Sequence, residues 1–413
     1  MNDKIKVGII GAGAAGMMAA VFAARHGAHV DIFEKNSNVG RKLSITGKGR
    51  CNVTNDCDRQ EFLKNVISNP KFLYASINNF DTAETKAFFE SVGVELKTER
   101  GRRVFPVSDK ASDIVNAMCR SMTENGCVIH REKAVGITVK DGRACGIKTE
   151  AREYDFDSVI CATGGKSYPR TGSDGDGYSF AESMGIKVTP LFPSLVPLET
   201  VDDVSEIMGV SLKNITLTVK NSQSGKEVFS ELGEMLFTHF GISGPLVLSA
   251  SSHMRIRNGE KYTAYIDFKP ALDFQTLDKR VLSDFSKYIN KDFSNSLSSL
   301  LPSKIIPFFV VKTGISPSEK VNVITKEQRR KIVETLKGMK LDIKGTRPID
   351  EAIVTSGGID VSEINPSTME SKKVNGLYFA GEIIDVDAYT GGYNLQIAFS
   401  TGALAGKCAA LGK

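Results

Sequence analysis

The sequence predicts a mixed α/β protein in which one parallel-sheet domain is interrupted by an inserted segment. Three observations lead to this prediction. Over residues 1–190, short buried apolar stretches alternate with helical stretches, as in a parallel sheet covered by helices. Residues 191–275 instead show the apolar–polar alternation of antiparallel strands, and residues 276–345 show helical periodicity. Residues 346–413 return to strands, glycine turns and a last helix, so we expect them to complete the first domain.

The N-terminal segment carries a dinucleotide-binding pattern. We expect a buried strand over residues 5–10 and a helix over residues 17–26, joined by glycines with the spacing G-x-G-x-x-G. Gly11 permits the tight turn, Gly13 lets the backbone approach a pyrophosphate, and Gly16 lets helix and strand pack closely. The pyrophosphate would lie at the helix N-terminus, where free N–H groups and the helix dipole favour an anion.

An acid follows the second expected strand, over residues 29–33. This acid is Glu34, which lies 23 residues after Gly11, where a carboxylate can accept a hydrogen bond from a ribose 2′-hydroxyl. An acid here disfavours a 2′-phosphate, so the pattern predicts FAD or NAD rather than NADP. The candidate cofactor-binding residues of this segment are Gly11, Gly13, Ala14, Ala15, Gly16, Glu34 and Lys35.

The remaining elements follow from periodicity and from turn residues. In the first domain we expect helices over residues 82–91 and 112–125, and strands over residues 94–97, 128–130, 134–140, 144–149 and 158–162. In the insert we expect strands over residues 214–220 and 262–268, and helices over residues 277–290, 297–309, 316–323 and 326–336. Strands over residues 351–355 and 377–380 and a helix over residues 395–411 end the chain.

Composition and charge limit the class of protein. The chain has 413 residues, of which 41% are hydrophobic and 24% charged, as in an ordinary soluble protein. It has no apolar run long enough to span a bilayer and no room for a signal peptide before the first strand, so we expect a cytoplasmic protein without membrane contact. Seven cysteines without a CxxC pair, and five histidines without ligand spacing, indicate reduced thiols and no metal site.

The net charge of +5 is unevenly distributed along the chain. Residues 278–347 hold 15 Lys and Arg against 7 Asp and Glu, a balance of +8, so the rest of the chain sums to −3. A local basic surface is a candidate footprint for RNA or another polyanion. The alternative is a solvated helical face.

Two later turns resemble signatures of two-dinucleotide flavoproteins. The turn after the strand of residues 377–380 resembles their second FAD signature, and this resemblance implies an acid that accepts hydrogen bonds from the ribityl chain. The turn after residues 158–162 resembles the A-T-G turn of the same class, which implies that it crosses beside the dinucleotide. The N–H groups before the last helix would face the flavin pyrimidine edge. The candidates at these turns are Gly381, Glu382, Asp385, Gly392, Tyr393, Asn394, Leu395, Thr163, Gly164 and Gly165.

Several long glycine-rich motifs extend along the chain, namely Gly40-Arg41-Lys42, Thr46-Gly47-Lys48-Gly49-Arg50-Cys51-Asn52, and residues 164–169, 237–245 and 381–394. Together they resemble the HI0933-like family of bacterial flavoproteins over nearly the whole chain. The resemblance implies a Rossmann-like FAD-binding domain interrupted by an inserted β-barrel-like domain and a helical subdomain. Lys48 departs from the family pattern, which more often has glycine there. Further cofactor-binding candidates are Arg41, Lys42, Gly49, Arg50, Cys51 and Asn52. The basic residues among them fit contacts to a phosphate or the substrate, or else a solvated loop.

The resemblance also implies an activity. Relatives are associated with reduction of an unsaturated 3-oxo bile-acid intermediate, and with reduction of a uridine in large-subunit ribosomal RNA to dihydrouridine. Both reactions add a hydride to the β carbon of a C=C bond conjugated to a carbonyl and a proton to the α carbon. Since the chain has no second complete nicotinamide fingerprint, we expect FAD as the bound cofactor and NADH or NADPH as a transient hydride donor, although another donor is an alternative.

Such a reduction needs an acid near the flavin. Cys51 is the first candidate because a thiol can donate a proton at neutral pH, and the alternative is a small buried residue that shapes its loop. His239 lies in a glycine-containing turn and is the second candidate, with a histidine satisfied by the backbone as the alternative. Tyr168 and Tyr393 are further candidates.

The sequence therefore predicts a FAD-dependent reductase of CH–CH bonds, acting on a small molecule or on ribosomal RNA. An RNA enzyme needs a basic surface, whereas a steroid enzyme needs an apolar pocket, and the charge distribution favours RNA. A flipped base would stack on Phe237, Phe240 or Tyr168. Two rival hypotheses are an amine or ketone oxidase that produces hydrogen peroxide, and a non-catalytic flavin-binding regulator that interacts with RNA.

Overall fold

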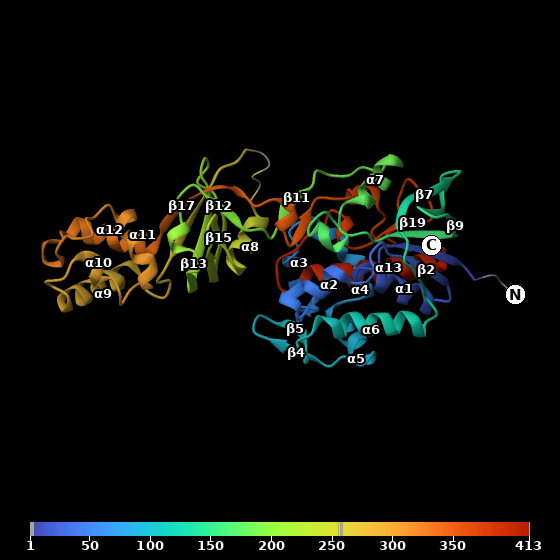
Figure 1. Cartoon of the computed structure of the whole chain (residues 1–413), viewed down its shortest axis with the longest axis horizontal. Helices are drawn as coiled ribbons and strands as arrows, with labels where there is room; N and C mark the ends of the chain where they lie inside the picture. Colours follow the sequence, from blue (N-terminus) through green and yellow to red (C-terminus); the bar gives the residue numbers. More distant parts are fainter. Residues whose placement is uncertain (1–3, 255, 257–258, 413) are drawn as a thin grey trace. The chain divides into compact units, whose positions relative to one another are not determined.

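A computed structural model describes residues 4–254, 256 and 259–412 of the chain (Figure 1). The described residues divide into two compact units. The first unit comprises Met1–Ser194 and Ala352–Lys413, and the second comprises Leu195–Glu351. The chain thus leaves the first unit after Ser194 and returns to it at Ala352.

A parallel sheet forms the centre of the first unit. In the described part of the chain its strand order is β19-β10-β1-β2-β6, and all neighbouring strands are parallel. The strands are β1 (Lys6–Ile10), β2 (His29–Phe33), β6 (Val128–His130), β10 (Ser158–Cys161) and β19 (Leu377–Phe379). Because β19 comes from the C-terminal segment, the end of the chain completes the sheet that the N-terminus begins. The Rossmann-like α/β class predicted from the sequence is confirmed.

Two helices of the first unit pack with their backbones in contact. They are α1 (Ala14–Arg25) and α13 (Tyr393–Leu411), which lie side by side in Figure 1. A Cβ atom on Gly402 would lie 2.4 Å from the carbonyl oxygen of Ala15, and one on Gly406 would lie 2.2 Å from that of Ala19. Only glycine permits this approach, so the two glycines fix α13 against α1.

Smaller elements surround this sheet within the first unit. The helices are α2 (Arg41–Ile45), α3 (Arg59–Lys64), α4 (Tyr74–Asn79), α5 (Thr82–Ser91), α6 (Ala111–Glu124) and α7 (Asp176–Ser183). Three small antiparallel sheets contain β3 (Thr54–Asn55), β5 (Arg103–Pro106) and β4 (Leu96–Glu99); β7 (Ala134–Lys140), β8 (Arg143–Thr149) and β9 (Glu153–Asp155); and β11 (Phe192–Ser194) with β18 (Val354–Ser356). α5 begins where predicted, because Asp81 and Glu84 form a capping box.

A closed barrel forms part of the second unit. Among the described residues its strand order is β12-β15-β14-β13-β16-β17. The strands are β12 (Leu198–Thr200), β13 (Ser211–Asn221), β14 (Glu227–Phe237), β15 (Gly241–Ser243), β16 (Tyr262–Asp267) and β17 (Met339–Thr346), with α8 (Pro245–Ser252) between β15 and β16. Ile215, Leu217 and Val219 of β13 are buried at alternate positions, as the sequence pattern predicted. The predicted barrel-like insert is confirmed.

Helices make up the rest of the second unit, and two predicted helices are wrong. The structure has α9 (Phe274–Lys287), α10 (Phe293–Ser296), α11 (Ile306–Thr313) and α12 (Lys326–Lys337). The helix predicted over residues 297–309 begins only at Ile306, because Pro307 is tolerated in a first turn but not in a helix interior. Residues 316–323, which contain Pro317, form only a short 3₁₀ turn at Val321–Val323.

A buried carboxylate ties α9 to the segment that follows it. Asp284 is 1% exposed and accepts hydrogen bonds from Arg280 Nε at 3.0 Å, Ser299 Oγ at 2.9 Å and Lys287 Nζ at 3.3 Å. Burial opposes ionisation, but these donors outweigh it and lower the pKa of Asp284 below its usual 3.8. The ionised form therefore stabilises the folded state.

We expect Asp284→Asn to lower the free energy of unfolding by about 1–2 kcal/mol at neutral pH, because the amide replaces an acceptor by a donor. A lowered pKa stabilises the fold above the unfolded-state value, and this contribution is lost as pH falls. The difference between variant and wild type should therefore shrink as pH falls below the usual 3.8. Urea unfolding at several pH values measures this, and a difference that stays constant down to pH values of about 2 would contradict it.

Candidate functional site

The three glycines after β1 have different surroundings. Gly11 has φ +98°, and a Cβ atom there would lie 2.6 Å from the carbonyl oxygen of Ala162. A Cβ atom on Gly16 would lie 1.9 Å from the carbonyl oxygen of Gly11. A Cβ atom on Gly13, however, would meet no described atom within 4 Å. Gly11 and Gly16 are therefore required by packing, whereas Gly13 borders open space.

That open space lies at the N-terminus of α1. Gly13 is the N-cap residue, no side chain of the described residues caps the helix, and its first turn contains no acid. The N–H groups of Ala14, Ala15 and Gly16 come before the first α-helical hydrogen bond, which Met17 donates to Gly13. An open approach to free N–H groups at a positive helix end fits the pyrophosphate of a dinucleotide.

Glu34 lies beside this turn at the end of β2. Its Oε2 accepts from the backbone N–H of Ala12 at 3.0 Å, and its Oε1 accepts from Asn36 N at 2.9 Å and Asn36 Nδ2 at 2.7 Å. Arg41 donates to Asn36 Oδ1 at 2.7 Å. These bonds hold the Glu34 carboxylate beside the glycine turn between β1 and α1. A carboxylate so held retains acceptor capacity for a ribose hydroxyl.

Lys35 is paired with the segment that begins α7. Its Nζ lies 2.6 Å from Asp174 Oδ2 and 2.9 Å from Asp176 Oδ2. Its ammonium is therefore neutralised by two carboxylates, and this contact joins the end of β2 to the start of α7. Asp174 and Asp176 belong to no motif named above, and the one local signal for them is the glycine-rich turn Asp174-Gly175-Asp176-Gly177.

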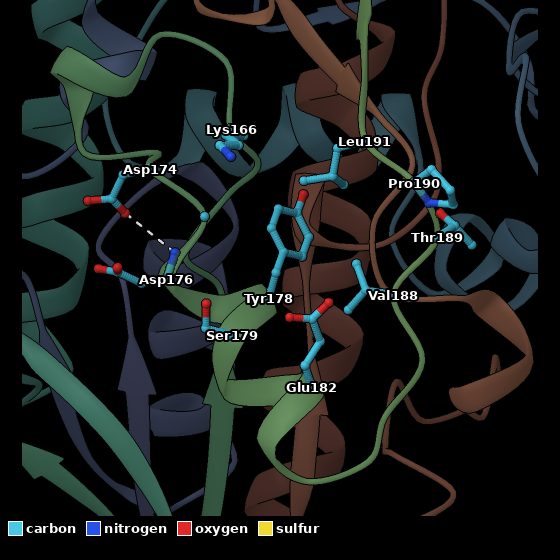
Figure 2. A pocket seen from close by; sticks show the side chains of 11 residues that line it. Lys166, Asp174, Asp176, Tyr178, Ser179, Glu182, Val188, Thr189, Pro190 and Leu191 are labelled. Atoms are coloured by element: carbon cyan, nitrogen blue, oxygen red, sulfur yellow. Dashed lines mark hydrogen bonds between the residues drawn. The ribbon is translucent and has the colours of Figure 1, made fainter. Parts of the chain in front are cut away.

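The two aspartates also line a cavity of about 450 Å³ in the first unit (Figure 2). Figure 2 shows Tyr178 between Lys166 and Glu182 in this cavity. Burial raises the pKa of Tyr178 well above its usual value, and the charge of Glu382 acts in the same direction, so its hydroxyl stays protonated. Apart from its glycines, no motif in the sequence indicates this cavity.

Glu382 is the centre of a polar cluster behind the turn of residues 163–165. Its Oε2 accepts from Lys42 Nζ at 2.6 Å, and its Oε1 accepts from Ser167 Oγ at 2.8 Å and the backbone N–H of Thr355 at 2.9 Å. A Cβ atom on Gly165 would lie 2.8 Å from Glu382 Oε1. The structure thus joins Lys42, Gly165 and Glu382, which the sequence placed in three separate motifs.

Two further turn glycines, Gly381 and Gly164, are closely packed near the glycine turn between β1 and α1. A Cβ atom on Gly381, which has φ +80°, would lie 2.7 Å from the Cβ atom of Ala15. Thr163 and Gly164 follow β10, the neighbour of β1 in the sheet, and a Cβ atom on Gly164 would lie 2.9 Å from Ser173 Oγ. Asp385 is half-buried and lies three residues beyond Glu382.

The start of α13 is held by a side chain of its own first turn. Asn394 Oδ1 accepts from the N–H of Ala388 at 3.0 Å, and its Nδ2 donates to the carbonyl oxygens of Ala388 at 2.8 Å and Tyr389 at 3.2 Å. The N-cap residue Gly392 has φ +98°, and no described side chain caps the helix. Tyr393 is buried against Phe62, and Leu395 is half-buried. This N-terminus also offers free N–H groups to a ligand.

The loop of residues 46–52 is occupied by protein contacts. The Arg50 guanidinium donates from Nε to Asp109 at 2.8 Å, pairs with Glu99 and lies 4.2 Å from the Phe105 ring centroid. Cys51 has no exposed surface, and burial raises its pKa to about 12. Asn52 has a buried Oδ1 without a hydrogen-bond partner among the described residues, and Gly49 has φ +84°. This arrangement fits a loop shaped by Arg50 and Cys51.

His239 lies in the second unit, in the turn between β14 and β15. Its ring centroid is 4.9 Å from that of Phe240. Tyr168 lies in the first unit, has φ +51° and is half-buried. The role of each as an acid or a stacking residue stays a prediction.

Most cations of residues 278–347, here called the basic segment, are ion-paired. Of its 15 Lys and Arg residues, all of which the structure describes, ten lie within 4.0 Å of a carboxylate. The other five are Lys279, Lys291, Lys304, Lys326 and Lys331. This pairing supports the solvated-face alternative more than a continuous polyanion footprint.

The described residues contain no group of three or more His, Cys, Asp or Glu side chains that could hold a metal ion. In the same part of the chain, no helix combines the length and apolar character that a membrane crossing requires.

Comparison with known proteins identifies the family of the chain. A family model described as HI0933-like protein Rossmann domain matches residues 5–408. The chain is 32% identical over 411 residues to a 3-dehydro-bile acid delta(4,6)-reductase from Clostridium scindens, covering 98% of this chain and 99% of that protein. It is 30% identical over 399 residues to a ribosomal RNA dihydrouridine synthase from Escherichia coli, covering 95% of each.

A solved structure of 3-ketosteroid-delta4-(5alpha)-dehydrogenase from Rhodococcus jostii RHA1 shares the fold. Its TM-score to this chain is 0.53 at 15% identity, with 99% of this chain and 97% of that chain covered. At this identity the likeness shows the fold alone.

Proposed function

Since the chain belongs to the HI0933-like Rossmann domain family and is a FAD-dependent oxidoreductase, we propose that it reduces a C=C bond conjugated to a carbonyl, with NADH or NADPH as hydride donor. The observation that carries FAD binding is the open space at Gly13 before the uncapped N-terminus of α1. The two relatives support the reaction, since a delta(4,6)-reductase and a dihydrouridine synthase are both named for saturating such a bond.

Different residues of the first unit would bind different parts of the cofactor. The N–H groups of α1 hold the pyrophosphate, Glu34 accepts from the adenosine ribose, and the N-terminus of α13 faces the flavin pyrimidine edge. Glu382 accepts from the ribityl chain while Lys42 balances its charge. When bound, FAD supplies a two-electron hydride store.

The substrate also needs a proton at its α carbon. His239 is the acid that we propose, because Cys51 is sealed from solvent and a thiol whose pKa is about 12 is a poor acid at neutral pH. Neither nicotinamide nucleotide is favoured over the other by the residues of the site.

We expect Cys51→Ala to change the rate of substrate-dependent flavin reoxidation by no more than about threefold, whereas loss of a general acid costs about 100- to 10,000-fold. His239→Gln is the matched variant, and it should lower the rate by at least about 100-fold. Anaerobic stopped-flow absorbance measures both rates. A loss confined to Cys51→Ala would restore Cys51 as the acid.

Two substrate classes are supported by different observations. A small unsaturated 3-oxo steroid is supported by the relative at 32% identity, which covers 98% of this chain, and by the ion pairing of the basic segment. A uridine of large-subunit ribosomal RNA is supported by the relative at 30% identity and by the +8 balance of residues 278–347. We place the steroid class first.

The test reduces the yellow protein anaerobically with NADH or NADPH, then adds a 3-oxo-4,6-diene bile acid or unmodified ribosomal RNA. We expect reoxidation by the bile acid. Reoxidation by RNA alone, with dihydrouridine found by mass spectrometry, would assign the RNA substrate. No reduction by either nucleotide would contradict the proposed hydride donor. Hydrogen peroxide formed with amines in air would favour the oxidase hypothesis, and bound flavin without any turnover would favour the regulator.

A further inference from the structure

A buried carboxyl group lies just before the start of α13. Asp387 is 1% exposed. Its Oδ2 accepts from Ser194 Oγ at 2.7 Å, and its Oδ1 accepts from Ser356 Oγ at 3.4 Å. Burying a carboxyl group is unfavourable unless its polar atoms are bonded, so a carboxyl group with a serine hydroxyl on each oxygen is a built site.

The two serines belong to separate segments of the first unit. Ser194 ends β11, through which the chain leaves this unit, and Ser356 ends β18, through which it returns. The two strands are antiparallel neighbours. Asp387 also contacts a third segment, because Ile67 N donates to its carbonyl oxygen at 2.8 Å. Asp387 therefore connects β11, β18 and the segment of Ile67.

Asp387 is joined through the next residue to the first turn of α13. Ala388 follows Asp387, and both its N–H and its carbonyl oxygen are bonded to the Asn394 side chain. A displacement of Asp387 is thus transmitted through one residue to the N-terminus of α13.

We propose that Asp387 is a positioning residue. Its carboxyl group fixes residues 388–392 and the first turn of α13 against β11 and β18, in the arrangement that receives the flavin pyrimidine ring. The proposal rests on the FAD site proposed above. Asp387 acts through Asn394 and the backbone, so it need not touch the flavin itself.

The surroundings of Asp387 favour its protonated form. Burial raises its pKa, and the negative charge of Asp385 acts in the same direction. The serine hydroxyls of β11 and β18 lower the pKa, but burial outweighs them. Because a raised pKa stabilises the folded arrangement below the ordinary aspartate range, this contribution is lost as pH rises through the raised value. Ionisation then places an additional negative charge before the α13 turn.

The test measures the dissociation constant of FAD and the visible spectrum of the bound flavin as functions of pH. Wild type is compared with Asp387→Asn, which cannot ionise, and with Ser194→Ala and Ser356→Ala, which each remove one hydroxyl. Asp284→Asn is the control, because it replaces an aspartate of equal exposure in the other unit.

In wild type we expect FAD binding to weaken by about tenfold or more from acid to alkaline pH, with a flavin spectral shift in the same range. Asp387→Asn should remove both changes, and Asp284→Asn should keep them. Each serine variant should weaken FAD binding by about three- to tenfold. If Asp387→Asn fails to fold, the serine variants carry the test.

Wild-type pH profiles retained in Asp387→Asn, or serine variants that bind FAD like wild type, would overturn the inference while leaving the FAD site intact. A wild-type protein that binds no FAD would instead refute the proposed function, and the inference with it.

Discussion

Gly13→Val should remove FAD binding while leaving the fold in place. The isopropyl group would enter the open space at the N-terminus of α1, where a Cβ would meet no atom of another described segment within 4 Å. Its φ of −84° suits any residue, and the change of N-cap residue costs about 1 kcal/mol. Loss of two charge-assisted hydrogen bonds to the pyrophosphate would weaken FAD binding by about 100-fold or more.

The measurement is the dissociation constant of FAD by fluorescence, together with the thermal midpoint of the apoprotein. Gly136→Val is the matched control, because Gly136 lies in β7 of the same unit and also has no atom within 4 Å of a Cβ. FAD binding to Gly13→Val at wild-type strength would show that the pyrophosphate lies elsewhere.

Glu382→Ala should have the second-largest effect, because it acts on both stability and cofactor binding. It leaves the Lys42 ammonium, whose side chain is 22% exposed, without its carboxylate, and it leaves the N–H of Thr355 without this acceptor. Removing one partner from such a cluster costs about 2–4 kcal/mol. FAD binding should weaken by a further tenfold or so if Glu382 accepts from the ribityl chain.

Lys42→Ala separates the two effects. It breaks the same ion pair but leaves the carboxylate in place, so it should destabilise the apoprotein while weakening FAD binding less than Glu382→Ala. The double variant should be less destabilised than the sum of the single variants, because the two residues are in contact. Equal loss of FAD affinity in both single variants would restrict Glu382 to a structural role.

Local patterns in the sequence were sufficient to predict the strand, turn and helix over residues 6–25. The β1 strand, the glycine spacing and Glu34 all lie within one stretch of chain, and each is dictated by its own neighbours. The same holds for β13, whose alternation predicted its buried face. The two helices predicted over residues 297–309 and 316–323 are wrong for a local reason as well. Pro307 and Pro317 exclude a helix interior at these positions, although the apolar spacing around them is helical.

Long-range contacts could not be predicted from one sequence. Arg50 was expected to contact an anion, but its partners Glu99 and Asp109 lie 49 and 59 residues away along the chain. Lys35 is a cofactor candidate whose ion-pair partners lie beyond residue 170, and its role at the cofactor stays a prediction. Asp387 has no such local signal, because Glu382 and Asp385 are both acids nearer the Gly381 turn, and only the folded chain brings Ser194 and Ser356 to Asp387.

We propose that this protein passes two electrons from bound FAD to a conjugated C=C bond. An anaerobic single turnover tests this, in which reduced holoprotein is mixed with the 3-oxo-4,6-diene bile acid or with unmodified ribosomal RNA. Reoxidised flavin and saturated product are then counted. We expect one double bond reduced for each flavin reoxidised with one of the two substrates. Reduced flavin that persists with both, and reacts only with oxygen to form hydrogen peroxide, would contradict it.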